Sequence, residues 1–235
     1  MDLAFANDRD GLLLTVGIPG GECQTQTTTI WRTGDGAASW QKLTATGIAD
    51  ALCKTGLVAA DATHSYFTAS RPGANPVIYR TADGGTSWTA SMPIAVPPNL
   101  ASQGSSFVFL TSRPRAFGSV VLVDGAGGQQ TKDVFRSTDG GATFAYASTV
   151  PTFEGTVGYV TATRWLQIAP PSSSMETTDG GATWHAYTTD YSQAAPVGPD
   201  IVFGDASVGY ATVRGSIQRT TDGGAHWTTI KTPGT

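Results

Sequence analysis

Four arginines stand at matching places along the chain, each at the end of a run rich in apolar and β-branched residues: Arg71, Arg113, Arg164 and Arg214. Such runs are typical of strands, which places the four guanidinium groups at strand ends. A guanidinium group donates hydrogen bonds in a planar fork that matches carboxylate and phosphate, so a convergent set would bind an anion. The neighbouring Trp165 would extend that surface. In the alternative interpretation, each arginine pairs with a backbone carbonyl or an acid as part of the packing.

Acid–base chemistry has weaker support. Hydrolysis of a glycosidic bond needs two carboxylates that face one cleft. Glu154, in a Pro-Thr-Phe-Glu-Gly loop, is the most plausible single acid, and no spacing pairs it with a second one. The histidines are far apart, at His64, His185 and His226, so no metal site is predicted. The sequence contains no phosphate loop or nucleophile elbow, and it predicts no cofactor.

Composition and charge narrow the function further. The chain has 235 residues, a formal net charge of −4 and only 14% charged residues, which argues against a nucleic-acid partner. No apolar run has the length needed for a membrane helix, so no membrane insertion is expected. With 29 Gly and 13 Pro beside 40% hydrophobic residues, the composition favours a turn-rich all-β fold.

An octapeptide recurs five times and sets the fold. The aspartates of successive copies are 40 to 56 residues apart. Asp-Gly and Gly-Gly supply the positive φ angles of a tight hairpin, and the aspartate can accept hydrogen bonds from the turn. The copies begin at Thr33, Thr81, Ser137, Thr177 and Thr220, have Asp35, Asp83, Asp139, Asp179 and Asp222 in third place, and end on Trp40, Trp88, Phe144, Trp184 and Trp227.

Five equivalent aspartates indicate five equivalent structural roles rather than a catalytic or calcium site, which would need more oxygen ligands at each copy. The aromatic residue is expected to turn inward and bury apolar area between neighbouring repeats. The residue that precedes each copy is also charged: Arg32, Arg80, Arg136, Glu176 and Arg219. These four arginines are weaker candidates for anion binding, because Glu176 in the fourth copy shows that the position accepts either charge, and they are expected to cover aromatic surface on the same side as the hairpins.

The octapeptide resembles the Asp box, Ser/Thr-x-Asp-x-Gly-x-x-Trp/Phe, also called the BNR repeat. Ala37 replaces the second glycine in the first copy, and Phe144 replaces tryptophan in the third. The resemblance covers the whole chain and points to the β-propeller superfamily of sialidases, xyloglucan-active endoglucanases, sortilin ectodomains and photosystem II assembly factors. It implies four-stranded antiparallel blades with one box in each, and it says little about function.

About 47 residues per copy suit one blade, which predicts a single β-propeller domain over 1–235 with five blades. A closed five-bladed ring would be a monomer. The competing interpretation is that the chain is an excerpt of a propeller with six to eight blades. The predicted blades are approximately 1–45, 46–93, 94–149, 150–190 and 191–235.

Strand placement in such blades puts the Asp-box hairpins on one rim. The loops between second and third strands, and the connections between blades, lie on the other. Cys23 and Cys53 both map to this second rim in adjacent blades, which predicts a disulfide, although two unpaired thiols remain the alternative. A disulfide favours a secreted or periplasmic protein; the first residues lack the features of a signal peptide.

We expect each of Arg71, Arg113, Arg164 and Arg214 to end the second strand of its blade, on the rim opposite the Asp boxes. The favoured function is a non-catalytic binding or scaffold propeller that recognises an anionic glycan or a protein segment through this rim. The alternative is a glycoside hydrolase of the sialidase-like or endoglucanase-like type.

Overall fold

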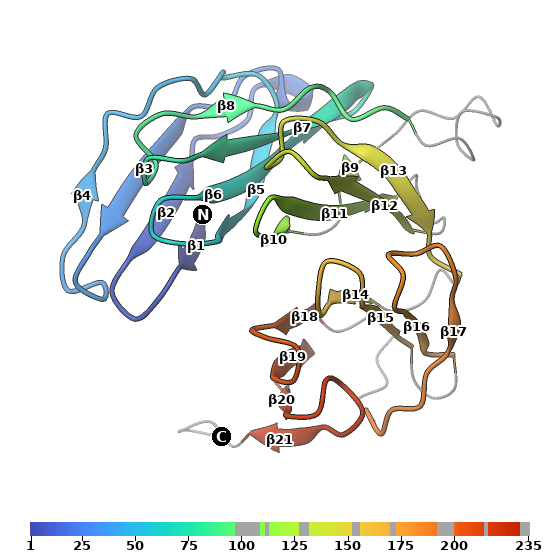
Figure 1. Cartoon of the computed structure of the whole chain (residues 1–235). Helices are drawn as coiled ribbons and strands as arrows, with labels where there is room; N and C mark the ends of the chain where they lie inside the picture. The colour runs from blue at the N-terminus through green and yellow to red at the C-terminus, as the bar shows by residue number, and fades with distance from the viewer. Residues whose placement is uncertain are drawn as a thin grey trace. The chain divides into compact units, whose positions relative to one another are not determined.

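The computed structural model describes residues 1–96, 109–110, 113–126, 132–151, 156–169, 173–191, 200–213 and 216–230. Within these ranges the regular structure is almost all β, and the one helix is the single-turn 3₁₀ helix η1 (Gly21–Cys23). The strands form five antiparallel sheets that follow one another along the chain, as Figure 1 shows. The predicted fold class, a β-propeller with five blades of four antiparallel strands, is confirmed. None of the described helical residues forms a segment long and apolar enough to cross a bilayer.

The chain divides into two compact units, which are described separately below. Unit 1 comprises Met1–Gly128 and Asp133–Tyr146, and unit 2 comprises Gln129–Lys132 and Ala147–Thr235. Blades 1 to 3 belong to unit 1 and blades 4 and 5 to unit 2, with the division inside the last strand of blade 3.

The strands of blades 1 to 3 pair with their neighbours in sequence order. Blade 1 contains β1 (Asp2–Phe5), β2 (Gly11–Val16), β3 (Thr28–Thr33) and β4 (Gln41–Lys42). Blade 2 contains β5 (Cys53–Ala59), β6 (Ser65–Arg71), β7 (Ala74–Thr81) and β8 (Thr89–Ala90). Blade 3 contains β9 (Phe109–Leu110), β10 (Arg115–Phe117), β11 (Val120–Ala126), β12 (Lys132–Ser137) and β13 (Ala145–Thr149).

The blades of unit 2 follow the same order. Blade 4 contains β14 (Thr156–Tyr159), β15 (Trp165–Ile168), β16 (Met175–Thr177) and β17 (His185–Ala186). Blade 5 contains β18 (Asp200–Phe203), β19 (Gly209–Val213), β20 (Ser216–Thr220) and β21 (Thr228–Ile230).

Two strand assignments from the sequence are wrong. In blade 3, β9 and β10 both pair with β11, so Phe109 and Leu110 belong to a split first strand and not to the second. In blade 4, the run that ends at Arg164 forms the first strand β14 and a turn, in which the Val160 amide donates to the Arg164 carbonyl at 3.0 Å. A β-rich run has the same composition in either strand, so composition alone could not distinguish them.

The two ends of a blade differ. The Asp-Gly turns contact the turns between first and second strands, since the Gly84 amide donates to the Thr63 carbonyl at 2.9 Å and the Gly180 amide to the Thr163 carbonyl at 2.8 Å. We call this end of each unit the turn rim. The opposite end, with the second-to-third loops and the connections between blades, is the loop rim.

The five Asp-Gly turns share one hydrogen-bond pattern. The hydroxyl of the first residue donates to Oδ1 of the aspartate at 2.7–2.8 Å. The residue four positions after the aspartate donates to the same carboxylate from its backbone amide. In the first four turns its side-chain hydroxyl also donates to this carboxylate. These bonds lower the pKa of Asp35, Asp83 and Asp179 to about 2, with the side-chain bonds from Ser39, Ser87 and Thr183 as the largest causes.

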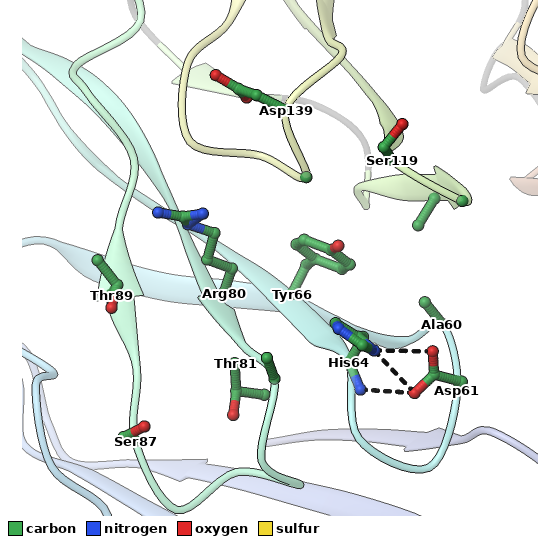
Figure 2. Close-up of a pocket in the computed structure, with 14 residues that line it drawn as sticks. Ala60, Asp61, His64, Tyr66, Arg80, Thr81, Ser87, Thr89, Ser119 and Asp139 are labelled. Carbon is green, nitrogen blue, oxygen red and sulfur yellow. Dashed lines mark hydrogen bonds and ion pairs between the residues drawn. The ribbon is translucent and has the colours of Figure 1, made fainter.

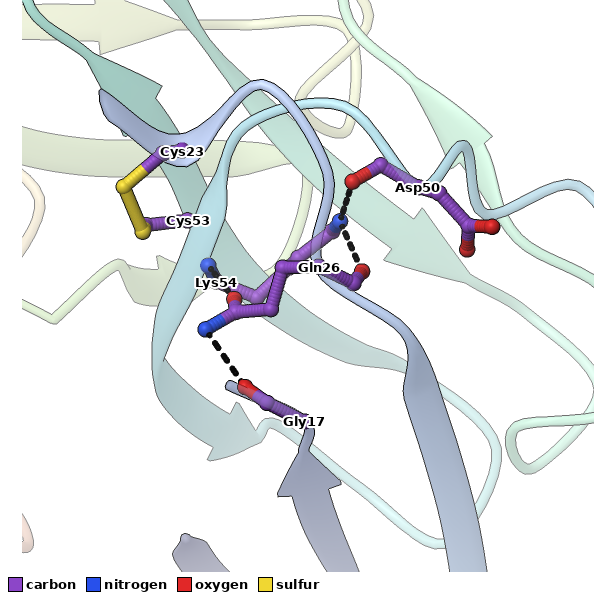
Figure 3. Close-up of a disulfide and its surroundings, with 6 residues drawn as sticks. All are labelled: Gly17, Cys23, Gln26, Asp50, Cys53 and Lys54. Carbon is purple, nitrogen blue, oxygen red and sulfur yellow. Dashed lines mark hydrogen bonds between the residues drawn. A yellow bond between two sulfur atoms is a disulfide. The ribbon is translucent and has the colours of Figure 1, made fainter. Parts of the chain in front are cut away.

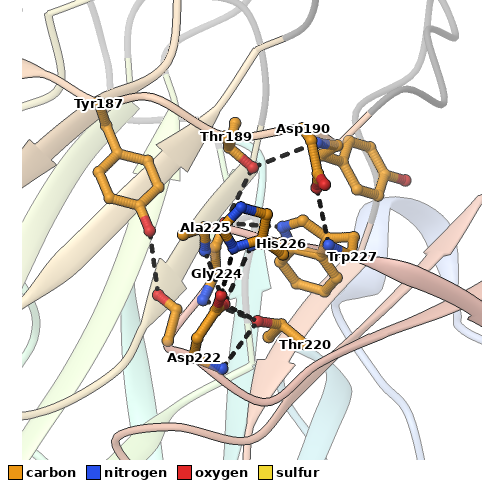
Figure 4. A network of polar contacts seen from close by, with 11 residues as sticks. Tyr187, Thr189, Asp190, Thr220, Asp222, Gly224, Ala225, His226 and Trp227 are labelled. Atoms are coloured by element: carbon orange, nitrogen blue, oxygen red, sulfur yellow. Dashed lines mark hydrogen bonds and ion pairs between the residues drawn. The ribbon is translucent and has the colours of Figure 1, made fainter.

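In the fifth turn His226 replaces that hydroxyl residue, and its Nδ1 lies 2.5 Å from Asp222 Oδ2 (Figure 4). Residues from the end of blade 4 join the network: Thr189 Oγ1 donates to the Gly224 carbonyl at 2.8 Å, and Asp190 Oδ1 accepts from the Trp227 amide at 2.7 Å. The carboxylate of Asp222 holds the pKa of His226 above its ordinary value.

The space between adjacent blades, called a seam here, is filled by apolar side chains. Trp88 and Trp227, from the second and fifth turns, are 3% and 8% exposed, which agrees with the inward orientation predicted for them. Trp88 packs on Phe67 with ring centroids 4.7 Å apart between blades 1 and 2. Phe144 is only partly buried against the cluster between blades 2 and 3.

Candidate functional site

The predicted disulfide is present on the loop rim of unit 1. Cys23 and Cys53 are bonded with their Cα atoms 5.1 Å apart, which ties η1 to the first residue of β5 (Figure 3). Beside this bond, the buried Lys54 donates from Nζ to the Gln26 carbonyl at 2.8 Å and to the Asp50 carbonyl at 2.9 Å. Burial lowers the pKa of Lys54, opposed by the charge of Asp50. The disulfide and these hydrogen bonds together hold the second-to-third loop of blade 1 against the connection between blades 1 and 2.

Arg113 reaches the first strands of blades 1 and 2 on the loop rim. Its Nη2 lies 3.5 Å from Oδ1 of Asp2, and its side chain is 49% exposed. The other oxygen of Asp2 accepts from the Gly56 amide at 2.8 Å and from Thr55 Oγ1 at 3.3 Å. The carboxylate is therefore held mainly by β5, and Arg113 keeps donors that face solvent.

Arg71 is the last residue of β6, the second strand of blade 2, as predicted. The pairing of Ser70 with Cys53 places it on the loop rim beside the start of β5. It is half-buried, and none of the acids in the described ranges lies within 4 Å of its guanidinium group. Arg71 and Arg113 thus share a rim of unit 1, although only Arg71 ends a second strand.

Arg164 lies on the turn rim of unit 2, which corrects its predicted position. Its Nε is 2.6 Å from Glu176 Oε1, and its guanidinium carbon is 5.9 Å from the centre of the Tyr187 ring. A Cβ on Gly223 would come within 2.6 Å of Arg164 Nη1, so the side chain packs closely on the fifth turn. Arg164 is engaged within its own unit.

The remaining predicted residues do not add to this surface. Trp165 is fully buried on β15, with its ring 5.7 Å from Tyr159 and 6.4 Å from Trp184, so it packs in a core and cannot extend an exposed site. Arg214 and Glu154 lie outside the described residues.

Unit 1 also contains a cavity of about 700 Å³ on its turn rim, between blades 2 and 3 (Figure 2). Its walls come from the first turn of blade 2, from β6 to β8 and from the turns of blade 3. The charged and aromatic groups that line it are Asp61, His64, Tyr66, Arg80 and Asp139.

Arg80 is the cation of the cavity, and its Nε is buried without a hydrogen-bond partner among the described atoms. Both carboxylates of the lining are occupied. Asp61 accepts from the Thr63 amide at 2.7 Å, the His64 amide at 2.8 Å and the Thr63 hydroxyl, and its Oδ2 lies 2.9 Å from His64 Nδ1. Burial would raise the pKa of Asp61, but the bonds from His64 and Thr63 outweigh it and leave the pKa below its usual value.

Asp139 is the aspartate of the third Asp-Gly turn. It accepts from the Ser137 hydroxyl at 2.7 Å, from the Ala142 amide at 2.9 Å and from both the amide and the hydroxyl of Thr143. The bonds from Thr143, followed by that from Ser137, hold its pKa well below the ordinary range.

The sequence predicted Arg80 as one of the weaker candidates among the arginines before the turns and favoured a covering role for it. The third turn differs from the others because it ends in Phe144 instead of tryptophan, but Phe144 is not among the residues that line the cavity. No group of three or more metal-ligating side chains occurs among the described residues.

No family model and no curated protein matches this chain. Its structure is similar to that of YCF48 bound to D1 peptide, with a TM-score of 0.52 and 16% identity over 99% of this chain and 68% of the other. An α-L-arabinanase from Penicillium chrysogenum complexed with arabinobiose gives a TM-score of 0.52 and 14% identity, over 95% of this chain and 78% of the enzyme. A PL25 ulvan lyase bound to -[GlcA(1-4)Rha3S]- gives 0.50 and 12%, over 96% of this chain and 68% of the lyase. At these identities the similarity establishes the β-propeller fold alone, which this chain shares with peptide-binding and polysaccharide-active proteins.

Proposed function

We propose that the protein is an extracytoplasmic, non-catalytic binding module of the Asp-box type. It recognises a carboxylate-bearing polymer, an anionic glycan or an acidic protein segment, through the loop rim of unit 1. The disulfide supports the location, because such bonds persist in oxidising compartments.

The geometry of Arg113 carries the proposal. Its pair with Asp2 is long, at 3.5 Å, and half of the side chain is exposed, while Asp2 is 15% exposed and held by β5. A fork of guanidinium donors positioned in this way can bind a ligand carboxylate without first breaking a strong internal pair. Arg71 adds a second cation on the same rim.

The carboxylates of the cavity support a binding role over hydrolysis. A glycosidase needs one carboxyl group with a raised pKa that donates a proton. The hydrogen bonds at Asp61 and Asp139 instead keep both pKa values low, so these groups stay ionised at neutral pH. Glu154 remains the candidate acid of the alternative, hydrolytic function.

The test is calorimetric titration of the wild-type chain with polygalacturonate and with poly-glutamate, at low and at physiological salt. We expect binding that weakens with salt and falls about tenfold or more in the Arg71→Gln/Arg113→Gln double variant, because bonds to charged groups contribute roughly 1.5–3 kcal/mol. Lys42→Gln, which removes an exposed cation from β4, is the matched control and should bind as the wild type does.

Undiminished binding by the double variant would remove this rim from the proposal. Release of reducing sugar from a glycan substrate, abolished by Glu154→Gln, would establish the hydrolase instead.

A further inference from the structure

We propose that the cavity between blades 2 and 3 on the turn rim of unit 1 is a second binding site, which takes a sugar unit bearing one carboxylate and pairs it with Arg80. This site lies on the opposite rim of the unit from Arg71 and Arg113, so it goes beyond the binding surface proposed above.

The state of Arg80 is the first observation. The residue lies on β7, and Figure 2 shows its side chain beside Tyr66 in the cavity wall. Its Nε is buried without a partner, and no acid of the described chain comes within 4 Å of the guanidinium group. A buried donor without a partner is unfavourable, and the side chain as a whole is only half-buried, so the guanidinium group can turn a donor toward a ligand oxygen in the cavity.

The second observation is the balance of charge around the cavity. Asp61 and Asp139 line it together with Arg80, and their oxygens are already occupied by donors of their own turns. Asp61 and Asp139 do not pair with Arg80, but their negative charges would still act on a ligand bound in the cavity. With two carboxylates and one arginine the lining carries no excess positive charge, so a ligand carboxylate is held by direct contact with the guanidinium group, and densely charged ligands such as polysulfates are disfavoured.

The third observation is the rest of the lining. Thr89 and Ser119 are exposed on the cavity wall and carry hydroxyl groups, while Tyr66 lines the cavity with only 3% of its surface exposed. A volume of about 700 Å³ lies within the range of small-ligand sites, roughly 300–1,000 Å³. Hydroxyl groups and one cation together match the hydroxyls and the carboxylate of a uronic acid.

Strand pairing offers a variant that closes the site and keeps Arg80. Thr89 on β8 is directly opposite Arg80 on β7, so the two side chains are on the same face of the sheet. A glutamate at position 89 would pair with the guanidinium group and place its own carboxylate where the ligand's is expected.

The experiment is titration of the intact protein with glucuronate, with glucose as the neutral probe, followed by calorimetry or NMR chemical-shift changes. We expect saturable glucuronate binding, little response to glucose, and at least about tenfold weaker glucuronate binding in both Arg80→Gln and Thr89→Glu. Arg219→Gln removes the exposed arginine at the same position of the fifth repeat and should leave binding unchanged. Thermal unfolding of each variant verifies that it is folded.

Glucuronate binding that is absent in the wild type, or unchanged in a folded Thr89→Glu variant, would overturn the proposal. So would tighter binding of a glutamate-containing peptide at the same residues, since the occupant would then be protein. The Arg71→Gln/Arg113→Gln variant should retain this site, so failure of either surface can be told from failure of the other.

Discussion

The two seams of unit 1 contain the same elements, an arginine and an Asp-Gly turn, but one seam is filled and the other contains a cavity. At each, an arginine that precedes one Asp-Gly turn extends toward the glycines of the next turn. Arg32 lies so close to the second turn that a Cβ on Gly84 would be 2.8 Å from its Nη1, and the cavity left there is about 10 Å³. In the third turn, a Cβ on Gly140 would meet nothing within 4 Å and one on Gly141 would lie 3.8 Å from Arg80 Cδ, and the cavity beside Arg80 is about 700 Å³.

The aromatic residue at the end of the turn differs between the two seams. Trp88 is 3% exposed, and its Nε1 donates to the Gly85 carbonyl at 2.9 Å. Phe144 is smaller, has no N–H group and is only partly buried. A conserved turn geometry is thus compatible with a filled seam or an open one, and the side chains beside the turn decide which is formed.

In unit 2, the charged residue that precedes the Asp-Gly turn of blade 4 has a third kind of environment. Glu176 stands where the other repeats have arginine, and it pairs with Arg164 at 2.6 Å and with His185 at 2.9 Å. The charge before the turn is therefore satisfied inside blade 4, whereas that of Arg80 is left for a ligand.

The largest expected effect is on the free energy of unfolding, and it should differ between the filled seam of blades 1 and 2 and the open seam of blades 2 and 3. Replacing Trp88 with alanine should lower the free energy of unfolding by about 3–5 kcal/mol, because it removes a fully packed aromatic side chain. Phe144→Ala should cost less, about 1–2 kcal/mol, since part of its surface is already exposed. Urea unfolding of both variants measures the difference, and equal losses would contradict the contrast between the seams.

A smaller effect tests the closed charge pair. Glu176→Gln should lower the free energy of unfolding by about 1–2 kcal/mol, because Arg164, 25% exposed, loses its charged acceptor. Glu22→Gln, at an exposed position of η1, is the control and should be nearly neutral. A neutral Glu176→Gln variant would mean that blade 4 gains nothing from satisfying this position internally.

The smallest effect concerns the turns that both seams share. The folded-state pKa of Asp83 and Asp179 is about 2, below the ordinary 3.8, so the unfolded chain binds protons first as the pH falls. The contribution of these aspartates to stability should be constant above about pH 5 and should decrease between about pH 4 and pH 2. Ser87→Ala removes the largest cause at Asp83 and should weaken that decrease, as measured by unfolding at several pH values. A stability profile that stays flat down to pH 2 would exclude a contribution from these hydrogen bonds.

The sequence was sufficient for the fold because the octapeptide determines its own structure. Each turn forms from local hydrogen bonds, as at Asp83, and the repeat length fixes the number of strands in a blade. The disulfide was predictable from the same placement, since Cys23 and Cys53 fall on one rim of adjacent blades.

The candidate sites were less predictable because they depend on register and packing. Arg113 and Arg164 follow β-rich runs, yet Arg113 lies between the two parts of a split first strand and Arg164 lies in a turn, a difference that only strand pairing reveals. The cavity beside Arg80 depends on how the side chains of blades 2 and 3 pack, which residue types alone do not determine.

The Asp-Gly turns satisfy most of their polar groups within eight residues, as the bonds around Asp35 illustrate. The hydrogen bonds that close each hairpin therefore stay within its own blade, while the contacts of a turn with the adjacent blade, such as Thr189 with Gly224, differ from one seam to the next. Duplication or loss of a blade would change the seams and leave the hydrogen bonds of the Asp-Gly turns intact. Evolution can therefore alter what a propeller binds without altering how its hairpins close.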